Sequence, residues 1–151
     1  MFLTPLVLIA SATPDLWIFD AELKWSDPVF GRLIAPLGFI TDLASIPRAL
    51  RNLPFLDPDG LSRRPAAMHD WLYAEQSRGK DFADAFLRAA LLSDGASAAT
   101  ANTFYCGVHW FGAESWAGDK GALETRDFDT PGHYAAWRLS QPPSPSILSV
   151  P

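Results

Sequence analysis

The fold is decided by residues 65–93, which read PAAMHDWLYAEQSRGKDFADAFLRAALLS. Apolar residues recur every three to four positions on both sides of Gly79, the pattern of two amphipathic helices. The spacing predicts one helix from about Pro65 to Ser77 and another from about Asp81 to Ser93. Because the link from Gln76 to Lys80 is short, we expect the second helix to return antiparallel to the first.

These two helices carry a candidate catalytic site. His69 and Tyr73 are four residues apart, so they share one face of the first helix. On the antiparallel second helix, Asp84 is expected to lie level with Tyr73 and one turn from His69. We therefore expect the Asp84 carboxylate to accept a hydrogen bond from the tyrosine hydroxyl, the imidazole or both.

Such a set of residues has a definite chemistry. A neutral His69 accepts a proton from water, while Asp84 holds the opposite ring nitrogen and stabilises the imidazolium. Asp70 is a candidate ligand for a hard divalent cation such as calcium, which polarises a substrate carbonyl. Asp42, or backbone carbonyls of residues 39–45, would complete the oxygen shell of the cation.

A purely structural role accounts for the same residues. A buried His-Tyr-Asp network ties two helices together, because each polar group satisfies another. Asp84 has an alternative partner in Arg88, four residues along its own helix, and Asp70 has alternative partners in Arg48, Arg63 and Arg64. An open pocket at His69 would favour catalysis, whereas a cluster sealed under Trp71 or Phe39 would favour a polar clamp.

The first third of the chain is strand-like. Period-two alternation and β-rich composition predict strands at Leu6–Ser11, Leu16–Trp25 and Phe30–Ile34. Turn residues separate them at Ala12–Asp15 and Ser26–Pro28. A small antiparallel sheet or meander is the simplest assembly, with the residues after Phe30–Ile34 linking the sheet to the helices.

The predicted fold class is α+β: a small N-terminal antiparallel sheet packed on three to four helices. A third long helix is predicted to begin after Ser97 and to continue through Phe111 towards Trp116. A short helix from Pro47 to Leu53 supplies the possible fourth. We expect one domain over residues 1–118, followed by an irregular, extended Pro/Ser-rich extension over residues 119–151.

Composition excludes several functions. The net charge is −5 and no basic stripe is present, so nucleic acid is not an expected partner. Cys106 is the only cysteine, which excludes an internal disulfide and a cysteine-rich zinc site. The apolar start, Met1 to Ala12, is interpreted as a strand, with a targeting segment as the alternative. No apolar run has the ~20 residues of a transmembrane segment.

Several longer motifs surround the candidate site. They are Phe2–Leu6, Pro36–Pro47, Ala67–Tyr73 and, towards the second helix, Arg78 and Asp84–Phe86. Over about residues 2–116, these motifs resemble the domain-of-unknown-function family 1353 of phages and prophages. The resemblance implies a phage or prophage origin, but it does not imply a reaction.

A second, local resemblance concerns chemistry. The pattern His69-Asp70-x-x-Tyr73, with Asp84 on a following helix, is similar to the active-site helices of calcium-dependent secreted phospholipases. That resemblance implies that His69 activates water, Asp70 binds calcium, Asp84 orients the histidine and Tyr73 supports Asp84. The chain departs from that family in lacking a recognisable Gly-rich calcium loop before the helix and a disulfide framework.

Two functions therefore follow as expectations, of which the first is the leading one and the second the alternative. The first is a virion component of the phage tail or tail tip, synthesised in the bacterial cytoplasm and bound to other virion proteins or to copies of itself. The six Trp and ten Phe residues suit such contacts. The second is a metal-assisted hydrolase that attacks ester or amide bonds of the host envelope, in lipid or peptidoglycan, with His69 as the base. Both functions can occur in one protein.

Overall fold

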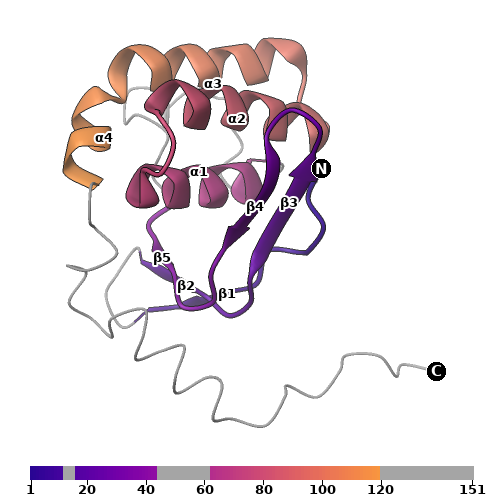
Figure 1. Ribbon diagram of the computed structural model, residues 1–151, viewed down its shortest axis with the longest axis vertical. Helices are drawn as coiled ribbons and strands as arrows, with labels where there is room; N and C mark the ends of the chain where they lie inside the picture. Colours follow the sequence, from indigo (N-terminus) through magenta and orange to yellow (C-terminus); the bar gives the residue numbers. More distant parts are fainter. Residues whose placement is uncertain (12–15, 44–61, 120–151) are drawn as a thin grey trace, which may run out of the picture.

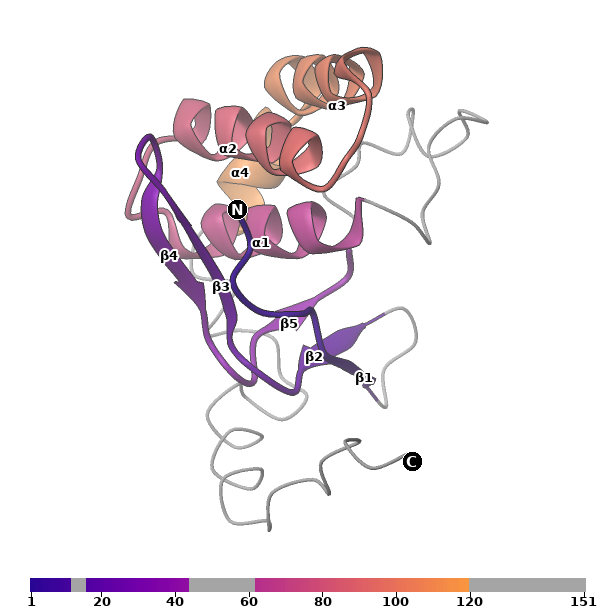
Figure 2. The same ribbon diagram turned by 90° about the vertical axis from the view of Figure 1, so that its right-hand side faces the viewer.

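The computed structural model describes residues 1–11, 16–43 and 62–119 of the chain. Its elements, in order, are β1 (Leu8–Ala10), β2 (Trp17–Phe19), β3 (Leu23–Asp27), β4 (Gly31–Ala35), β5 (Ile40–Thr41), α1 (Arg63–Glu75), α2 (Lys80–Ser93), α3 (Ala98–Phe111) and α4 (Ala113–Asp119). Helix α1 lies between the strands β1, β2 and β5 on one side and helices α2 and α3 on the other (Figure 1, Figure 2). This is the predicted α+β fold.

The strands form two antiparallel sheets rather than one. In the first sheet β2 is central, with β1 and β5 on its two sides, and Ile18 lies opposite both Ile9 and Ile40. In the second sheet β3 and β4 form a hairpin in which Trp25 lies opposite Leu33. Residues 40–41, which we predicted to belong to a linking segment, therefore form a short strand at a sheet edge.

The predicted strand Leu16–Trp25 is wrong as a single element. The chain changes sheets after Phe19, whose backbone N–H donates to the carbonyl of Phe39 at 2.9 Å, and Leu23 then pairs with Ala35 in the second sheet. The alternation continues across this break because Phe19, Leu23 and Trp25 are all buried in one core. Alternation thus indicates which side chains face the core, but not which strand is the hydrogen-bonding partner.

Aromatic side chains join the hairpin to the helices. The ring centroid of Trp25 lies 5.1 Å from that of Phe86 on α2 and 5.0 Å from that of Phe2. Both rings are nearly perpendicular to the Trp25 ring. Phe30 adds a third edge-to-face contact, at 5.6 Å from Phe86. Each such pair contributes about 0.5–1.5 kcal/mol beyond the area it buries. These contacts fix the side of α2 that faces the sheet, and therefore also the direction in which Asp84 points.

The helices begin and end within two residues of their predicted limits, except at α3. Ser97 caps α3 by accepting a hydrogen bond from the backbone N–H of Thr100 at 3.1 Å. The helix ends at Phe111, and Gly112 separates it from α4, so a continuous helix to Trp116 is not formed. The predicted helix Pro47–Leu53 and nearly all of the predicted extension lie outside the described residues. Among the described helices, none has the length and apolarity needed to span a membrane.

Candidate active site

The site is built across the antiparallel pair α1 and α2. The last turn of α1 ends at Gln76, whose left-handed φ of 50° reverses the chain, and α2 begins four residues later at Lys80. This short connection brings Asp84 opposite His69 and Tyr73, as the sequence predicts. Asp84 and His69 are fully buried, with an exposed fraction of 0% each.

Asp84 accepts hydrogen bonds at both carboxylate oxygens. Its Oδ1 accepts from the Tyr73 hydroxyl at 2.6 Å and lies 3.3 Å from Nε2 of His69. Its Oδ2 accepts from Nζ of Lys80 at 2.6 Å. The predicted alternative partner Arg88 instead donates to the side chain of Asn102 on α3. Asp84 therefore interacts with the histidine and tyrosine of α1 and does not form the ion pair with Arg88 along its own helix.

Lys80 extends this network to a third helix. Its ammonium group donates to the carbonyls of Val108 at 2.7 Å and His109 at 3.3 Å, in the last turn of α3. A cation at a helix C-terminus interacts favourably with the negative end of the helix dipole. The Val108 carbonyl also accepts a hydrogen bond from the backbone N–H of Gly112 at 2.8 Å. Lys80 thus connects Asp84 with the end of α3. The sequence could have indicated the Lys80–Asp84 ion pair, because the two residues are four positions apart in α2.

Gly112 provides the space in which these groups meet. A Cβ atom at this position would lie 2.3 Å from the carbonyl oxygen of Val108 and 2.7 Å from the hydroxyl of Tyr73. Real Cβ atoms do not approach so closely, so no larger residue fits here without a shift. The position after α3 is therefore adapted to the Tyr73–Asp84 hydrogen bond. From the sequence, Gly112 falls inside the helix that we predicted to continue towards Trp116, and that prediction gave the glycine no such role.

The surroundings set the charge of each group. Burial lowers the pKa of His69 and outweighs the opposing effect of Asp84, so the imidazole is neutral at pH 7. Burial opposes ionisation of Asp84, but hydrogen bonds from His69, Lys80 and Tyr73 outweigh it and lower the pKa of the carboxyl group. Burial and the neighbouring Asp84 raise the pKa of Tyr73, which stays a hydrogen-bond donor.

The two ring nitrogens of His69 have different surroundings. A neutral imidazole carries one N–H, and the carboxylate beside Nε2 places that hydrogen on Nε2. Nδ1 then carries a lone pair and has no hydrogen-bond partner. Among the described residues, it is the only buried side-chain N or O atom without one. An unsatisfied buried polar atom costs about 1–3 kcal/mol. A histidine that served only to join two helices would gain nothing from leaving this nitrogen unsatisfied.

The predicted metal ligands are Asp70, which follows His69 in α1, and Asp42, which directly follows β5. Asp70 is half-buried and its Oδ2 accepts a hydrogen bond from the hydroxyl of Thr41 in β5. Asp42, which follows Thr41 in the sequence, is exposed. The Thr41 hydroxyl also accepts from the backbone N–H of Leu43 at 2.9 Å, and Leu43 has a left-handed φ of 53°. The segment that ends β5 is thus attached to α1 next to His69.

A different set of metal-type ligands does converge in the described part of the chain. Asp81, Asp84 and His109 place one ligand atom each within 4.8 Å of one another. The ammonium of Lys80 already lies 2.6 Å from Oδ2 of Asp84 and supplies the positive charge there. Asp42 and Asp70 do not join a comparable three-ligand group of His, Cys, Asp or Glu among these residues. Calcium would therefore need backbone carbonyls or water as further ligands.

Comparisons with known proteins identify a family but no activity. No curated protein and no solved structure matches the chain. Residues 17–108 match the family described as "Protein of unknown function (DUF1353)". The match is shorter at both ends than the motif resemblance over residues 2–116, but it contains His69, Tyr73, Lys80 and Asp84. Because it spans more than half of the sequence, this chain belongs to the DUF1353 family.

Proposed function

We propose that this protein is a hydrolase in which Nδ1 of His69 activates a water molecule. The observation that carries the proposal is the unpartnered Nδ1 of a neutral, buried imidazole whose other nitrogen faces Asp84. Nearly all buried polar atoms in folded proteins have a partner, so an exception calls for an explanation. A general base is such an explanation, because it must keep a lone pair available for the proton of its substrate.

The reaction would be cleavage of an ester or amide. Water attacks the carbonyl carbon and gives a proton to Nδ1 of His69, and the imidazolium so formed is stabilised by the Asp84 carboxylate. The tetrahedral intermediate then expels the alcohol or amine, which takes up the proton from Nδ1 as it leaves. Tyr73 and Lys80 hold Asp84 in place and are positioning residues.

Burial adds a requirement to this proposal. His69 is 0% exposed, and Phe39 is buried in the core that also contains Tyr73. In this conformation the site is closed, and substrate reaches Nδ1 only when the elements packed over α1 move apart. This closed site is the outcome that we expected from the sequence for a permanent clamp between helices, and the clamp interpretation requires no such opening.

A divalent cation is the second part of the proposal. Asp70 and Asp42 are the residues proposed to hold it, and a cation such as calcium would supply positive charge to the substrate carbonyl. Asp70 lies on α1, the helix that carries His69, and accepts a hydrogen bond from the hydroxyl of Thr41 in β5. A calcium titration followed by thermal unfolding tests this: a rise in melting temperature at millimolar calcium that Asp70→Asn removes supports the site. An unchanged melting temperature removes the cation from the scheme.

The substitution His69→Gln tests the catalytic role. Glutamine retains an amide N–H that can donate to Asp84 and removes the basic lone pair. Wild type and variant are incubated with phospholipid vesicles and with purified peptidoglycan, with calcium and with a chelator, and released fatty acid or amine is measured. Cleavage by the wild type that the variant loses, at similar melting temperature, supports the proposal. Absence of cleavage by the wild type on both substrates contradicts it.

A role in the virion is the second candidate, and one surface feature favours it. Trp110 and Phe111, at the end of α3, are 69% and 67% exposed, and exposed aromatic pairs are typical of protein–protein interfaces. We propose that they contact a neighbouring tail protein or a second copy of this chain in a phage particle. Mass spectrometry of purified particles should find the protein. Its presence in lysing cells together with its absence from particles would contradict this role.

A further inference from the structure

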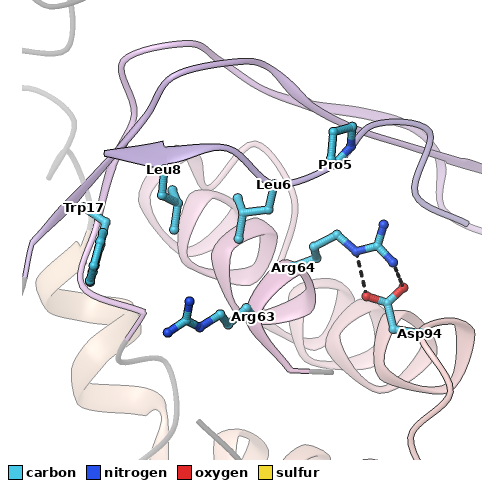
Figure 3. A pocket seen from close by; sticks show the side chains of 7 residues that line it. All are labelled: Pro5, Leu6, Leu8, Trp17, Arg63, Arg64 and Asp94. Carbon is cyan, nitrogen blue, oxygen red and sulfur yellow. Dashed lines mark hydrogen bonds and ion pairs between the residues drawn. The ribbon is translucent and has the colours of Figure 1, made fainter. Parts of the chain in front are cut away.

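His69 is fully buried, so a substrate needs an opening to reach it. A hollow of about 480 Å³ lies where β1 and β2 pass the first turn of α1 (Figure 3). Its described lining includes Leu6, Leu8 and Trp17 on one side and Arg63, Arg64 and Asp94 on the other. Neither His69, Tyr73 nor Asp84 is among the described residues that line it, so this hollow is not a route to His69.

The elements that cover α1 differ in how firmly they are held. Helices α2 and α4 and strand β5 pack against α1. Helix α2 contributes the fully buried Asp84 and Phe86, and both residues of β5 are buried. Helix α4, which lies beside the C-terminal end of α1 (Figure 1), has no buried residue. Because local opening occurs where few side chains are buried, α4 separates from α1 most easily of these three elements.

Helix α4 has little stability of its own. It consists of seven residues, Ala113–Asp119, and Gly118 weakens it further. A helix this short is not stable in water without packing against other elements. The end of α3 is held separately, because Lys80 donates to the carbonyls of Val108 and His109. Motion of α4 therefore leaves α3 in place, with Gly112 as the connection between them.

Trp116 is the residue of α4 that contacts the site. Its indole meets the ring of Tyr73 edge to face, with the ring centroids 5.1 Å apart, and its backbone carbonyl accepts a hydrogen bond from Nε2 of Gln76. On the same tyrosine, the ring centroid lies 4.2 Å from that of His69. Tyr73 thus contacts both Trp116 and His69, and removal of Trp116 uncovers the side chain that lies next to the proposed base.

We propose that α4 is a lid over the His69–Asp84 site and that Trp116 holds it closed. When α4 moves away from α1 about Gly112, Tyr73 borders solvent and small molecules reach His69. As a route for substrate, this inference rests on the hydrolysis proposed above. The opening itself is measured without substrate, so the lid and the hydrolase are tested separately.

Reaction of His69 with diethyl pyrocarbonate tests the lid, because this small reagent modifies a neutral imidazole that it can reach. Mass spectrometry measures the rate at His69 at pH 7 for the wild type, Trp116→Ala and Trp116→Phe. We expect Trp116→Ala to react at least about tenfold faster than the wild type, because the edge-to-face contact and the buried apolar area of the indole are lost. Trp116→Phe keeps an aromatic ring and should stay within about threefold of the wild type. An unchanged rate in Trp116→Ala overturns the lid.

Trp110→Ala is the matched control for this measurement. It removes the same side chain from the end of α3, where Trp110 is 69% exposed. The reaction at His69 should keep the wild-type rate in this variant. An acceleration equal to that of Trp116→Ala overturns the specific role of Trp116.

The wild type alone provides a second test, which a folding defect of a variant does not affect. Local opening of α4 exposes little surface, so the rate at His69 should hardly change at low concentrations of urea. The amide of Leu87, buried on α2, should instead exchange faster as urea promotes global unfolding. A rate at His69 that rises with urea in parallel with the exchange of Leu87 shows that only global unfolding exposes His69, and it overturns the lid.

Cleavage assays distinguish failure of the lid from failure of the hydrolase. Cleavage by the wild type, together with an unchanged rate of His69 modification in Trp116→Ala, leaves the hydrolase in place and overturns the lid. The expected acceleration at His69, together with a wild type that cleaves neither phospholipid nor peptidoglycan, supports the lid and contradicts the hydrolase.

Discussion

At the scale of single residues, two observations at His69 favour different interpretations. Its complete burial is what a permanent clamp between helices requires. Its unpartnered Nδ1 is what a general base requires and what a clamp would avoid. The hydrogen bonds of Asp84 fit both roles, because they hold the carboxylate ionised and fixed. The contribution of each side chain to the free energy of unfolding must therefore be measured separately from its contribution to the rate of bond cleavage.

Tyr73→Phe is the first prediction at this scale. The change removes the hydroxyl that donates to Asp84 at 2.6 Å, and we expect the free energy of unfolding to fall by about 1.5–3 kcal/mol, the range for hydrogen bonds to charged groups. The matched control is Tyr105→Phe, at a half-buried position on α3, where the expected change is smaller than about 0.5 kcal/mol. Urea denaturation measures both. Equal losses in the two variants would contradict the importance of the Tyr73–Asp84 bond.

The pH dependence of stability is the second prediction. Burial lowers the pKa of His69 below its ordinary value of 6.5. As the pH falls below 6.5, the unfolded chain therefore binds a proton that the folded protein does not bind. The free energy of unfolding should decrease from pH 7 to pH 5, by at most about 1.4 kcal/mol per pH unit for this one group. Asp84 adds to the loss once the pH falls below the ordinary carboxyl value of 3.8 towards its lowered folded pKa, because the unfolded chain then binds a proton that the folded protein does not bind.

Urea unfolding at pH 7, 6 and 5 checks this dependence. In His69→Gln the decrease over this range should become smaller, because the variant has no imidazole at this position. The same slope in variant and wild type would show that His69 does not have a lowered pKa in the folded protein. Changes below pH 4 are not diagnostic, since Asp84 then contributes as well.

At the scale of elements, the sequence predicted the helix pair well and the sheets less well. The apolar periodicity and the glycines after each helix located α1 and α2, and four-residue spacing with a short link placed His69 opposite Asp84. The strands were harder, because the alternation of Phe19, Leu23 and Trp25 continues across a change of hydrogen-bonding partner. Contacts between distant segments, such as Lys80 with Val108 or Thr41 with Asp70, leave no periodic trace in a sequence.

Gly112→Ala is the prediction for the junction of α3 and α4. The added Cβ would lie 2.3 Å from a backbone oxygen and 2.7 Å from the Tyr73 hydroxyl, so α3 or Tyr73 must shift. We expect a loss of about 1–3 kcal/mol in the free energy of unfolding. Gly118→Ala is the matched control, since a Cβ there meets no atom within 4 Å, and it should be neutral or slightly stabilising. Similar melting temperatures for both variants would be the contrary result.

Lys80→Met tests the connection between α2 and α3. Methionine keeps most of the side-chain volume and removes the ammonium that joins Asp84 to the carbonyls of Val108 and His109. We expect a loss of about 2–4 kcal/mol, because a buried carboxylate loses its charged partner. The control Lys24→Met breaks an exposed ion pair with Glu22 and should cost no more than about 1 kcal/mol. Hydrogen exchange should show faster opening of the last turn of α3 only in Lys80→Met.

At the scale of the whole molecule, the chain is an α+β protein of the DUF1353 family with two distinct concentrations of polar chemistry. One is the closed His69–Asp84 site between α1 and α2, and the other is the hollow at the start of α1, whose described lining includes Arg63, Arg64 and Asp94. The sequence predicted the first, because its residues lie on two neighbouring helices. It did not predict the second, which brings together β1, β2, α1 and Asp94 from four separate places in the chain.

The role of His69 as a general base is tested by comparing the rate of bond cleavage by His69→Gln with that by the wild type. The rate is measured on phospholipid vesicles and on peptidoglycan, together with the melting temperature of each protein. The wild type should cleave one of them, and the variant, folded to the same extent, should be slower by about 100-fold or more. An equally active variant, or a wild type that cleaves neither substrate, would contradict the role of His69 as a base and identify the cluster as a clamp between helices.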